Sequence, residues 1–178
     1  MGEKLTIWTI GHSTREWGEF VAILKEFEVA TLCDIRSLPG SRKFPQFNSD
    51  AMSEALARES IAYVWMGKGL GGRRSRGLGE TSPNKGFRSR GFRNYADYMQ
   101  SDAFRQALDD LIALAGRSRT AIMCAEILYF RCHRWLVSDA LTARGIRVVH
   151  IQDRGKASEH QLSHEARVAD GTVTYPGE

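Results

Sequence analysis

Cysteine is scarce in this chain, and long apolar runs are missing. The 178 residues include three cysteines, an odd number that fits reduced thiols better than a framework of disulfides. No apolar stretch approaches the length needed to cross a bilayer. The opening sequence MGEKLTIW lacks the charged-then-apolar order of a signal peptide. We therefore expect a cytoplasmic protein that does not associate with membranes.

The chain also lacks a recognisable cofactor or metal motif. Residues 67–72 are rich in glycine, but they have neither the Gly-Lys-Ser/Thr ending of a P-loop nor Gly-x-Gly-x-x-Gly spacing. A flexible turn is the better interpretation. His160 and His164 have the spacing of a metal-binding pair, with Glu165 beside them, but no convincing third ligand accompanies them. We expect no metal and no cofactor.

Apolar, β-rich segments alternate with helical patterns along the chain. Strands covered on both faces are almost uniformly apolar, and a repeated strand–helix order predicts a parallel sheet with helices on each side. We expect a single α/β domain over residues 1–178. Its predicted fold is a three-layer α/β/α arrangement with a mainly parallel five-stranded sheet, Rossmann-like or flavodoxin-like. The expected strands are residues 5–10, 30–35, 61–66, 121–125 and 147–151.

The connecting segments are expected to be helices, with two exceptions. Residues 67–94 are rich in Gly, Arg and Ser without clear periodicity, which predicts a long basic loop such as a lid or a binding loop. Residues 154–178 form a C-terminal extension, with a polar helical turn at 159–167 and a short strand at 171–175. The expected helices are residues 16–28, capped by Ser13 or Thr14, 50–59, capped by Asn48 or Ser49, 95–115 and 132–143.

Each expected strand ends in a polar cluster. Because parallel strands end at one edge of a sheet, and ligands bind there in open α/β folds, these clusters predict a site. The run from Thr120 to Glu126, followed by Cys132-His-Arg134 at the start of a helix, is the richest of them. The other clusters are Gly11-His-Ser-Thr14, Asp34-Ile-Arg-Ser37, residues 67–72 and Asp153.

Two cysteines fall at this predicted edge. Cys124 is a candidate thiolate nucleophile, activated by His12 or His133, although a buried free cysteine is more often a small apolar residue. Cys132 at a helix start has a similar claim, because the helix dipole lowers the pKa of a thiol there. A zinc site of Cys124, Cys132 and His133 is a further alternative, but the seven-residue gap matches no standard spacing.

Acidic and basic side chains accompany the cysteines. Glu126 is the better candidate for a general acid or base, since an acidic group at a strand end needs a partner such as Arg134, Arg36 or a substrate proton. Asp34 and Arg36 share a strand face, as a structural ion pair or as a base beside an anion clamp. His133 shares a helical face with apolar residues, which leaves a structural role equally open.

Positive charge is concentrated in one third of the chain. Between Arg36 and Arg93 we count twelve Lys or Arg against four Asp or Glu, whereas the whole chain has a net charge of +4. Arginine predominates, and its planar fork suits phosphate and carboxylate groups. The segment is either a solvated basic loop or a rim that collects anions.

Several short motifs, in this order, resemble the family known as domain of unknown function 488 (DUF488). The resemblance covers essentially the whole chain, and the Cys-Ala-Glu and Cys-His-Arg blocks are its specific part. It implies a bacterial, cytosolic, single-domain α/β protein and supplies no reaction. The motifs are TIGHST (9–14), DIRS (34–37), PQFN (45–48), LGG (70–72), YADY (95–98), MCAE (123–126), CHR (132–134) and VTYP (173–176). The corresponding family positions are His12, Ser13, Asp34, Arg36, Gly71, Gly72, Cys124, Glu126, Cys132, His133 and Arg134.

Three functional hypotheses follow. The leading one is an enzyme, a hydrolase or transferase, acting on a phosphate-bearing small molecule or nucleic acid. The second is a non-catalytic nucleic-acid-binding or regulatory module that uses residues 36–93, and the third is a thiol redox sensor. In the first, Glu126 or Asp34 is the acid or base, Cys124 the nucleophile and His12 a proton-transfer partner. The anion-binding candidates are Ser13, Arg36, Gly71, Gly72, Cys132, His133 and Arg134, and the nucleic-acid rim is Arg73, Arg74, Arg88 and Arg90.

Overall fold

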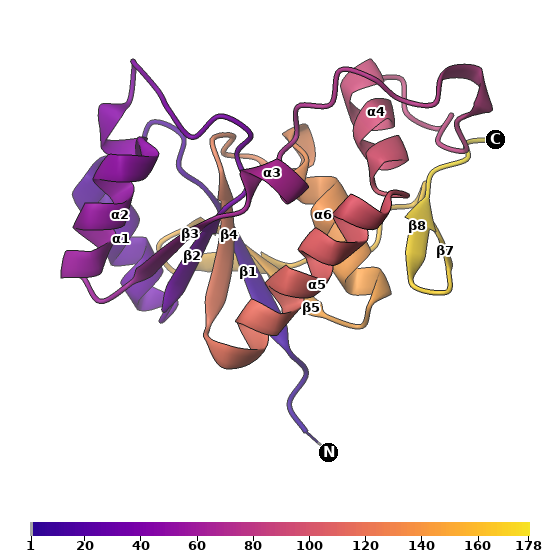
Figure 1. Ribbon diagram of the computed structural model, residues 1–178. Coiled ribbons are helices and arrows are strands. Elements are labelled where there is room, and N and C mark those ends of the chain that lie inside the picture. The colour runs from indigo at the N-terminus through magenta and orange to yellow at the C-terminus, as the bar shows by residue number, and fades with distance from the viewer. Residues whose placement is uncertain (1) are drawn as a thin grey trace.

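A six-stranded sheet forms the centre of the computed structural model, which describes residues 2–178 (Figure 1). Its first five strands are parallel and coincide with the five expected ones, so the mainly parallel α/β/α fold is confirmed. A sixth, antiparallel strand was not expected and extends the sheet beside β5. The strands are β1 (Thr6–Gly11), β2 (Thr31–Asp34), β3 (Ala62–Trp65), β4 (Thr120–Cys124), β5 (Arg147–Asp153) and β6 (Lys156–Glu159).

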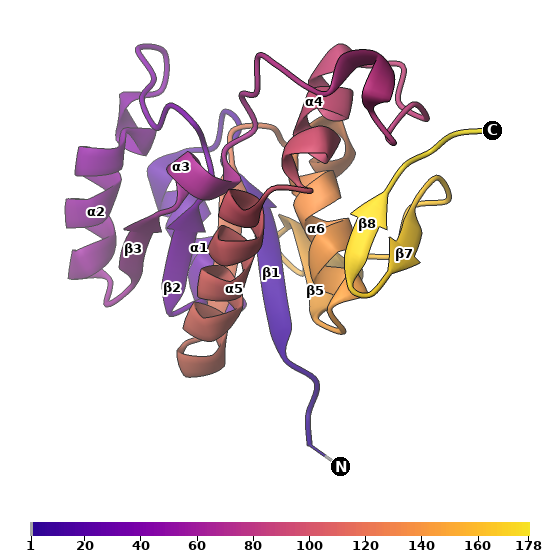
Figure 2. The same ribbon diagram turned by 45° about the vertical axis from the view of Figure 1, so that its right-hand side comes forward.

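Helices cover both faces of the sheet (Figure 2). One face carries α1 (Trp17–Glu26) and α2 (Ser49–Arg58), whose apolar residues pack on alternate residues of β1, β2 and β4. The opposite face carries α5 (Asp102–Arg117) and α6 (Arg134–Ala143). Strand alternation therefore supplies two cores, one on each side of the sheet. The remaining elements are α3 (Gly67–Leu70), α4 (Arg90–Tyr98), the 3-10 turns η1 (Pro45–Phe47), η2 (Gly79–Thr81) and η3 (Tyr129–Arg131), and a hairpin of β7 (Arg167–Ala169) and β8 (Thr172–Thr174) against α6.

The strand order determines where a crevice can open. The order β3-β2-β4-β1-β5-β6 differs from both the Rossmann order and the flavodoxin order, because β4 lies between β2 and β1. The chain leaves β1 and β2 toward the face of α1 and α2, but it leaves β4 toward the face of α6. Connections that part in opposite directions leave a gap between them. The carboxyl end of β4 is therefore the place for a site.

The segment between β3 and β4 differs most from expectation. A single helix over 95–115 was wrong, because α4 and α5 are separate and Ser101 caps α5 by accepting from the Phe104 N–H at 3.2 Å. The expected loop 67–94 contains α3, η2 and the first turn of α4. Buried Asp97 orders it by accepting hydrogen bonds from Leu78 N–H and from the side chain of Asn84, both at 2.8 Å.

Smaller corrections concern helix starts and the tail. The residue before α1 is Glu16 and the residue before α2 is Asn48, and neither side chain caps its helix. A helical turn at 159–167 was wrong, since Glu159 ends β6 and Arg167 begins β7. The expected strand at 171–175 is β8. β3 is an edge strand of the sheet, and its Trp65 is 46% exposed.

Within the described part of the chain, no helix combines the length and the apolar character that crossing a bilayer requires.

Candidate functional site

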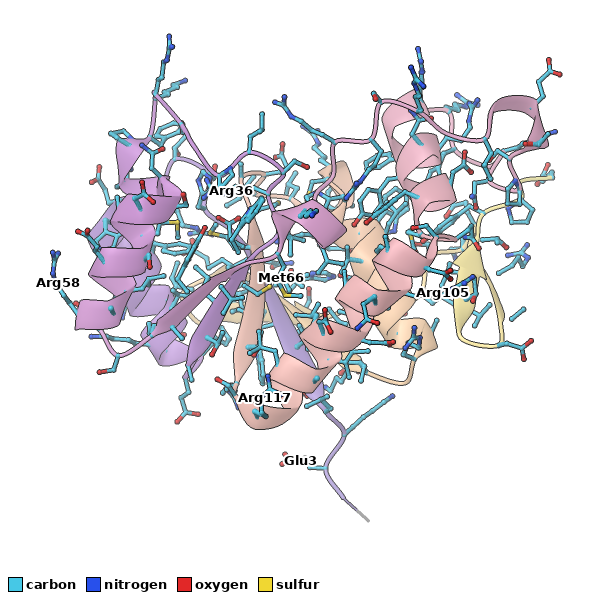
Figure 3. The ribbon with its side chains drawn as sticks, in the orientation of Figure 1. Glu3, Arg36, Arg58, Met66, Arg105 and Arg117 are labelled. Atoms are coloured by element: carbon cyan, nitrogen blue, oxygen red, sulfur yellow. The ribbon has the colours of Figure 1, made fainter. Side chains whose placement is uncertain are left out.

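An open cleft of about 540 Å³ lies at the carboxyl end of β4. Its walls come from residues 36–38 after β2, 72–73 after α3, 89–95 at the start of α4, and 124–133 between β4 and α6. Arg36, labelled in Figure 3, lies at the upper end of the sheet, where these segments meet. Of the residues chosen from the sequence, Arg36, Gly72, Arg73, Cys124, Glu126, Cys132 and His133 line this cleft.

The end of β1 is fastened beneath the cleft. His12 N–H donates to the Cys124 carbonyl at 2.9 Å, and Ser13 N–H donates to the following carbonyl at 3.0 Å. Gly11 permits this approach, because a Cβ there would lie 1.9 Å from the backbone oxygen of Glu126. Ser13 has a φ of 48°, a left-handed conformation that is uncommon for residues other than glycine. His12 and Ser13 therefore support the floor of the cleft and do not line it.

Two reduced thiols lie side by side at the base of the cleft. Cys124 ends β4 and Cys132 lies two residues before α6, and their sulfurs are 3.0 Å apart. Arg134 reaches both from behind, with Nε 3.0 Å from Cys124 Sγ and 3.4 Å from Cys132 Sγ. Cys124 is buried, whereas Cys132 is half-buried. The connection between β4 and α6 thus folds back so that the two cysteines meet.

The two thiols differ in acidity. The hydrogen bond from Cys124 and then the charge of Arg134 lower the pKa of Cys132 to about 6, against the opposing effect of burial. Burial, followed by the hydrogen bond to Cys132, raises the pKa of Cys124 well above its ordinary value. Cys132 is therefore a thiolate at neutral pH and Cys124 a thiol that donates to it. Of the two thiols that the sequence offered as candidate nucleophiles, this geometry favours Cys132 as the more reactive.

Arg134 is committed to the protein rather than to a substrate. It is only 1% exposed, and its Nη2 donates to the carbonyls of Glu126 at 2.5 Å and Ile127 at 3.2 Å. Its Nη1 donates to Thr9 Oγ1 at 3.1 Å. The sequence-based role of an anion clamp does not fit these contacts. Arg134 instead fixes the loop after β4 and supplies positive charge to the thiols.

Asp34 and Arg36 form a buried ion pair. Arg36 Nε and Nη2 donate to the two carboxylate oxygens at 2.9 and 2.7 Å, and Tyr63 Oη donates to the carboxylate at 2.5 Å. Arg36 Nη2 also donates to the Phe47 carbonyl at 2.7 Å. Asp34, fully buried, accepts a fourth bond from Arg36 N–H. Of the two interpretations left open by the sequence, the geometry favours the structural ion pair.

His12 belongs to the same buried cluster. Its ring stacks on Phe47 with centroids 4.3 Å apart, and Nδ1 donates to the Ser13 carbonyl at 2.9 Å. That bond fixes the tautomer, so Nε2 accepts from Arg36 Nη1 at 3.2 Å. Burial lowers the pKa of His12 to about 4, so the ring is neutral. Among the described residues, no hydrogen bond joins this ring to either thiol of the cleft.

His133 forms part of the cleft wall. Its Nε2 donates to the Ile35 carbonyl at 2.8 Å, which leaves Nδ1 as an acceptor. Burial lowers its pKa to about 4, despite the bond to Ile35. Gly72 passes directly over the ring, because a Cβ there would lie 2.6 Å from Nδ1. Buried Gly71 makes a similar approach to Ser37. Both glycines allow the chain to close one side of the cleft.

We expect acid to destabilise the fold through His133. An unfolded histidine has a pKa near 6.5 and the folded one about 4, so the unfolded chain takes up the proton first as the pH falls. Stability from the neutral ring is complete above pH ~6.5 and is lost toward pH ~4. Between pH ~7 and pH ~5 the free energy of unfolding, measured with urea, should fall by about 1 to 2 kcal/mol less in His133→Gln than in wild type. Equal losses in the two proteins would contradict this role.

Glu126 has a free carboxylate. The residue lines the cleft and is half-buried, yet among the described residues its side chain accepts no hydrogen bond and forms no ion pair. The expected partners are engaged elsewhere, since Arg36 binds Asp34 and Arg134 binds the Glu126 backbone. The carboxylate is therefore available to a bound molecule.

The predicted arginine rim is only partly at the cleft. Arg73 lines it and is exposed, whereas Arg74 lies over the Tyr98 ring at 3.5 Å and donates to backbone carbonyls. Arg88 and Arg90 are exposed on either side of Ser89, the residue that caps α4, but they do not line the cleft.

Other residues of the cleft were not expected from the sequence. Arg131 lines it from η3, and Phe92 and Tyr95 line it from α4. Arg131 could have been found from the sequence, because it is a basic residue directly before Cys132. Nothing in the local pattern distinguishes Phe92 and Tyr95 from ordinary core aromatics.

The considered metal pair is not formed. His160 is buried and bonded to Asp139 at 2.8 Å, while His164 is exposed. Residues 2–178 contain no group of three His, Cys, Asp or Glu side chains placed to hold a metal ion.

A protein family model described as Domain of unknown function DUF488 matches residues 16–141 of the chain. The matched part runs from before α1 almost to the end of α6 and includes both thiols of the cleft. No curated protein and no solved structure matches the chain.

Proposed function

The chain belongs to the DUF488 family, which names no reaction, and on that premise we propose a function from the cleft itself: a thiol-dependent redox enzyme with Cys132 as nucleophile. Cys124 is the second, resolving thiol. The observation that carries the proposal is the contact of the two reduced sulfurs at 3.0 Å, with Arg134 beside both, at the base of an open cleft. A low-pKa thiolate beside a second thiol is the arrangement used in thiol–disulfide exchange.

The reaction needs an oxidised sulfur compound as co-reactant. The Cys132 thiolate attacks one sulfur of a substrate disulfide, a new S–S bond forms, and the other substrate sulfur leaves as a thiolate. Cys124 gives its proton to that leaving thiolate and then attacks Cys132 Sγ. The second substrate thiolate is released, and the Cys124–Cys132 disulfide remains. One protein thiolate and one protein thiol are oxidised to a disulfide, and one substrate disulfide is reduced to one thiol and one thiolate, so electrons, protons and charge balance.

The lining of the cleft supports an anionic substrate. Arg73 and Arg131 are exposed there, and among the described residues their guanidinium groups have no acidic partner. The capped N-terminus of α4 contributes Ser89 and Gly91 to the same wall. Helix N-termini and arginines both favour phosphate groups. A phosphate-bearing small molecule therefore remains part of the proposal. A reducing cytoplasm suits the free thiols.

A second candidate function is acid–base chemistry on a phosphate-bearing substrate, as a hydrolase or transferase. It rests on the unpaired Glu126 carboxylate in the cleft. Asp34 is less suited to this role than expected, because its four hydrogen bonds occupy both oxygens. The two candidates differ in which substitution removes activity, Glu126→Gln or Cys132→Ser.

The test is oxidation of the reduced protein by a small aromatic disulfide, followed by intact mass and peptide mapping. We expect wild type to lose two hydrogens and to link Cys124 to Cys132. The Cys124→Ser variant should instead hold one probe molecule on Cys132, because the resolving thiol is gone. Labelling that begins at Cys33, or persistence of both cleft thiols in reduced form, would rule out the redox proposal.

A second measurement separates the anionic substrate from nucleic acid. Binding of inorganic phosphate and of single-stranded nucleic acid is followed by thermal shift in wild type, Arg131→Ala and Arg88→Ala. If phosphate binding is lost in Arg131→Ala but kept in Arg88→Ala, the anion binds in the cleft. Steeply salt-dependent nucleic-acid binding that Arg88→Ala weakens equally would favour the binding module over the enzyme.

A further inference from the structure

A line of buried hydrogen bonds leads from the thiols into the protein. Arg134, which contacts both sulfurs, donates from Nη1 to Thr9 Oγ1 at 3.1 Å. Thr9 Oγ1 lies 2.7 Å from His150 Nδ1, and His150 Nε2 lies 2.8 Å from His160 Nδ1. His160 Nε2 lies 2.8 Å from Asp139 Oδ1. We call Thr9, His150, His160 and Asp139 the buried chain; none of them exceeds 6% exposure or lines the cleft.

The sheet and one helix place these groups together. Thr9 on β1 and His150 on β5 are register partners of neighbouring parallel strands, so both point to the face that α6 covers. His160 follows β6 and is held by its N–H bond to the Val148 carbonyl at 2.8 Å. Arg134 and Asp139 both belong to α6. The hydrogen bonds therefore leave α6 at one residue and return to it just over one turn later.

The bonds can all be given one consistent direction. Arg134 has only donors, so Thr9 Oγ1 accepts from it, and its proton is donated to the unprotonated Nδ1 of a neutral His150 ring. His150 then accepts at Nδ1 and donates from Nε2 to His160, which donates to Asp139. Burial lowers the pKa of His150 to about 2, which agrees with a neutral ring. The chain thus has one consistent arrangement of protons, with an acceptor carboxylate at its end.

The Asp139 end of the buried chain is held by further hydrogen bonds. Besides His160, Asp139 accepts bonds from Ser163 N–H at 3.1 Å, from Ser163 Oγ at 2.5 Å and from Tyr175 Oη at 2.8 Å. Tyr129 stacks flat on His150, with ring centroids 3.6 Å apart. Each polar group of Thr9, His150, His160 and Asp139 thereby has a hydrogen-bond partner, which buried polar groups need in order not to destabilise the fold.

We propose that the buried chain consists of positioning residues that hold the Arg134 guanidinium against the two sulfurs and so sustain the Cys132 thiolate. This inference rests on the proposed function, because it assigns to the chain a part in the chemistry of that thiolate. The buried chain does not carry protons to the sulfurs, since the Arg134 guanidinium between them does not deprotonate in proteins. Its effect is to orient one donor and to keep the positive charge in place. Apolar residues of similar size would pack the same space without this geometry.

The test compares Thr9→Val with Thr9→Ser. Valine keeps the shape but removes the hydroxyl between Arg134 and His150, whereas serine keeps the hydroxyl. The readout is the pH dependence of iodoacetamide alkylation at Cys132, located by peptide mass. We expect the midpoint, about 6 in wild type, to rise by about one pH unit in Thr9→Val. Thr9→Ser should behave as wild type. A purely structural role for the hydroxyl would change thermal stability but leave this midpoint in place.

The ionisable groups around Cys132 are unchanged by either substitution. Cys124 and Arg134 contact it directly. The other ionisable side chains that line the cleft are Arg36, Arg73, Tyr95, Glu126, Arg131 and His133. Because all of them are present in both variants, a difference in midpoint between Thr9→Val and Thr9→Ser does not arise from the loss of an ionisable group.

A second variant keeps the inference testable if Thr9→Val does not fold. His150→Phe retains a ring that can stack on Tyr129 but removes both nitrogens from the chain, and it should also raise the midpoint. Unshifted midpoints in every folded variant overturn the inference while leaving the thiolate proposal standing. A wild-type midpoint at the ordinary cysteine value overturns the proposed function itself, whatever the variants do.

Discussion

Replacing Cys132 with serine is expected to slow alkylation of the folded protein at pH ~7 by about a hundredfold. The reason is that only Cys132 combines a low pKa with access to the cleft. Cys33 is fully buried and burial raises its pKa well above the ordinary value. Cys124 is 3% exposed and burial likewise keeps it a thiol. Stopped reactions with iodoacetamide, followed by peptide mapping, give the rate at each cysteine.

The pH profile and two control variants make this result specific. In wild type the rate should be half-maximal near the pKa of Cys132, about 6, and should remain high as the pH rises. Cys33→Ala should leave the profile unchanged. Cys124→Ala should move the midpoint upward, because the hydrogen bond from Cys124 is the largest cause of the low pKa. A fast reaction that persists in Cys132→Ser would mean that another thiol is the nucleophile.

The fold followed from the sequence where the hydrophobic pattern was strong. β1, β2 and β4 are short apolar runs bounded by polar residues, a pattern typical of strands covered on both sides. β6 could not be seen in the same way. All four of its residues are exposed, so it has no apolar alternation, and it forms because Gly155 turns the chain back with a φ of 62°.

The break between α4 and α5 shows a second limit. The apolar residues of the two helices continue in phase, so periodicity alone predicts one long helix over 95–115. The decisive signal was Ser101, whose side chain accepts from the Phe104 N–H and starts a new helix. Serine inside an apolar helical pattern is often tolerated, which is why local pattern did not settle the boundary.

The place of the candidate site was predictable, but the roles within it were not. Parallel strands end at one edge, so the polar residues after β2 and β4 were expected to meet, and Arg36, Cys124 and Cys132 do line one cleft. Sequence spacing does not show whether the oxygens of a carboxylate are already occupied by hydrogen bonds from other residues. Asp34 is occupied on both oxygens, whereas Glu126 is free, although both are acidic residues near strand ends.

The buried chain could not be predicted from the sequence, because it depends on contacts between residues that lie far apart in the sequence. Thr9 and His150 are separated by 141 positions, and their contact arises from the pairing of β1 with β5. Neither residue has a local pattern that distinguishes it from other strand residues. The buried chain therefore becomes visible only when the strand order is known.

Replacing Arg134 is expected to affect both stability and thiol chemistry. In Arg134→Gln, the carbonyls of Glu126 and Ile127 lose charged donors and the thiolate loses its neighbouring charge. We expect the free energy of unfolding to fall by about 3 to 5 kcal/mol, the usual cost of leaving buried charged or polar partners unsatisfied. The alkylation midpoint of Cys132 should rise by about one to two pH units, since Arg134 charge is among the causes that lower it.

Arg134→Lys separates the two effects. Lysine keeps a positive charge, but it lacks the planar fork that reaches two carbonyls, Thr9 and two sulfurs at once. Stability, measured by urea unfolding, should therefore fall almost as far as in Arg134→Gln, while the midpoint of Cys132 should move less. Equal midpoints in the two variants would show that the geometry of the guanidinium, and not its charge, stabilises the thiolate. An unchanged midpoint in both would remove Arg134 from the chemistry and leave it the structural role of fixing the loop after β4.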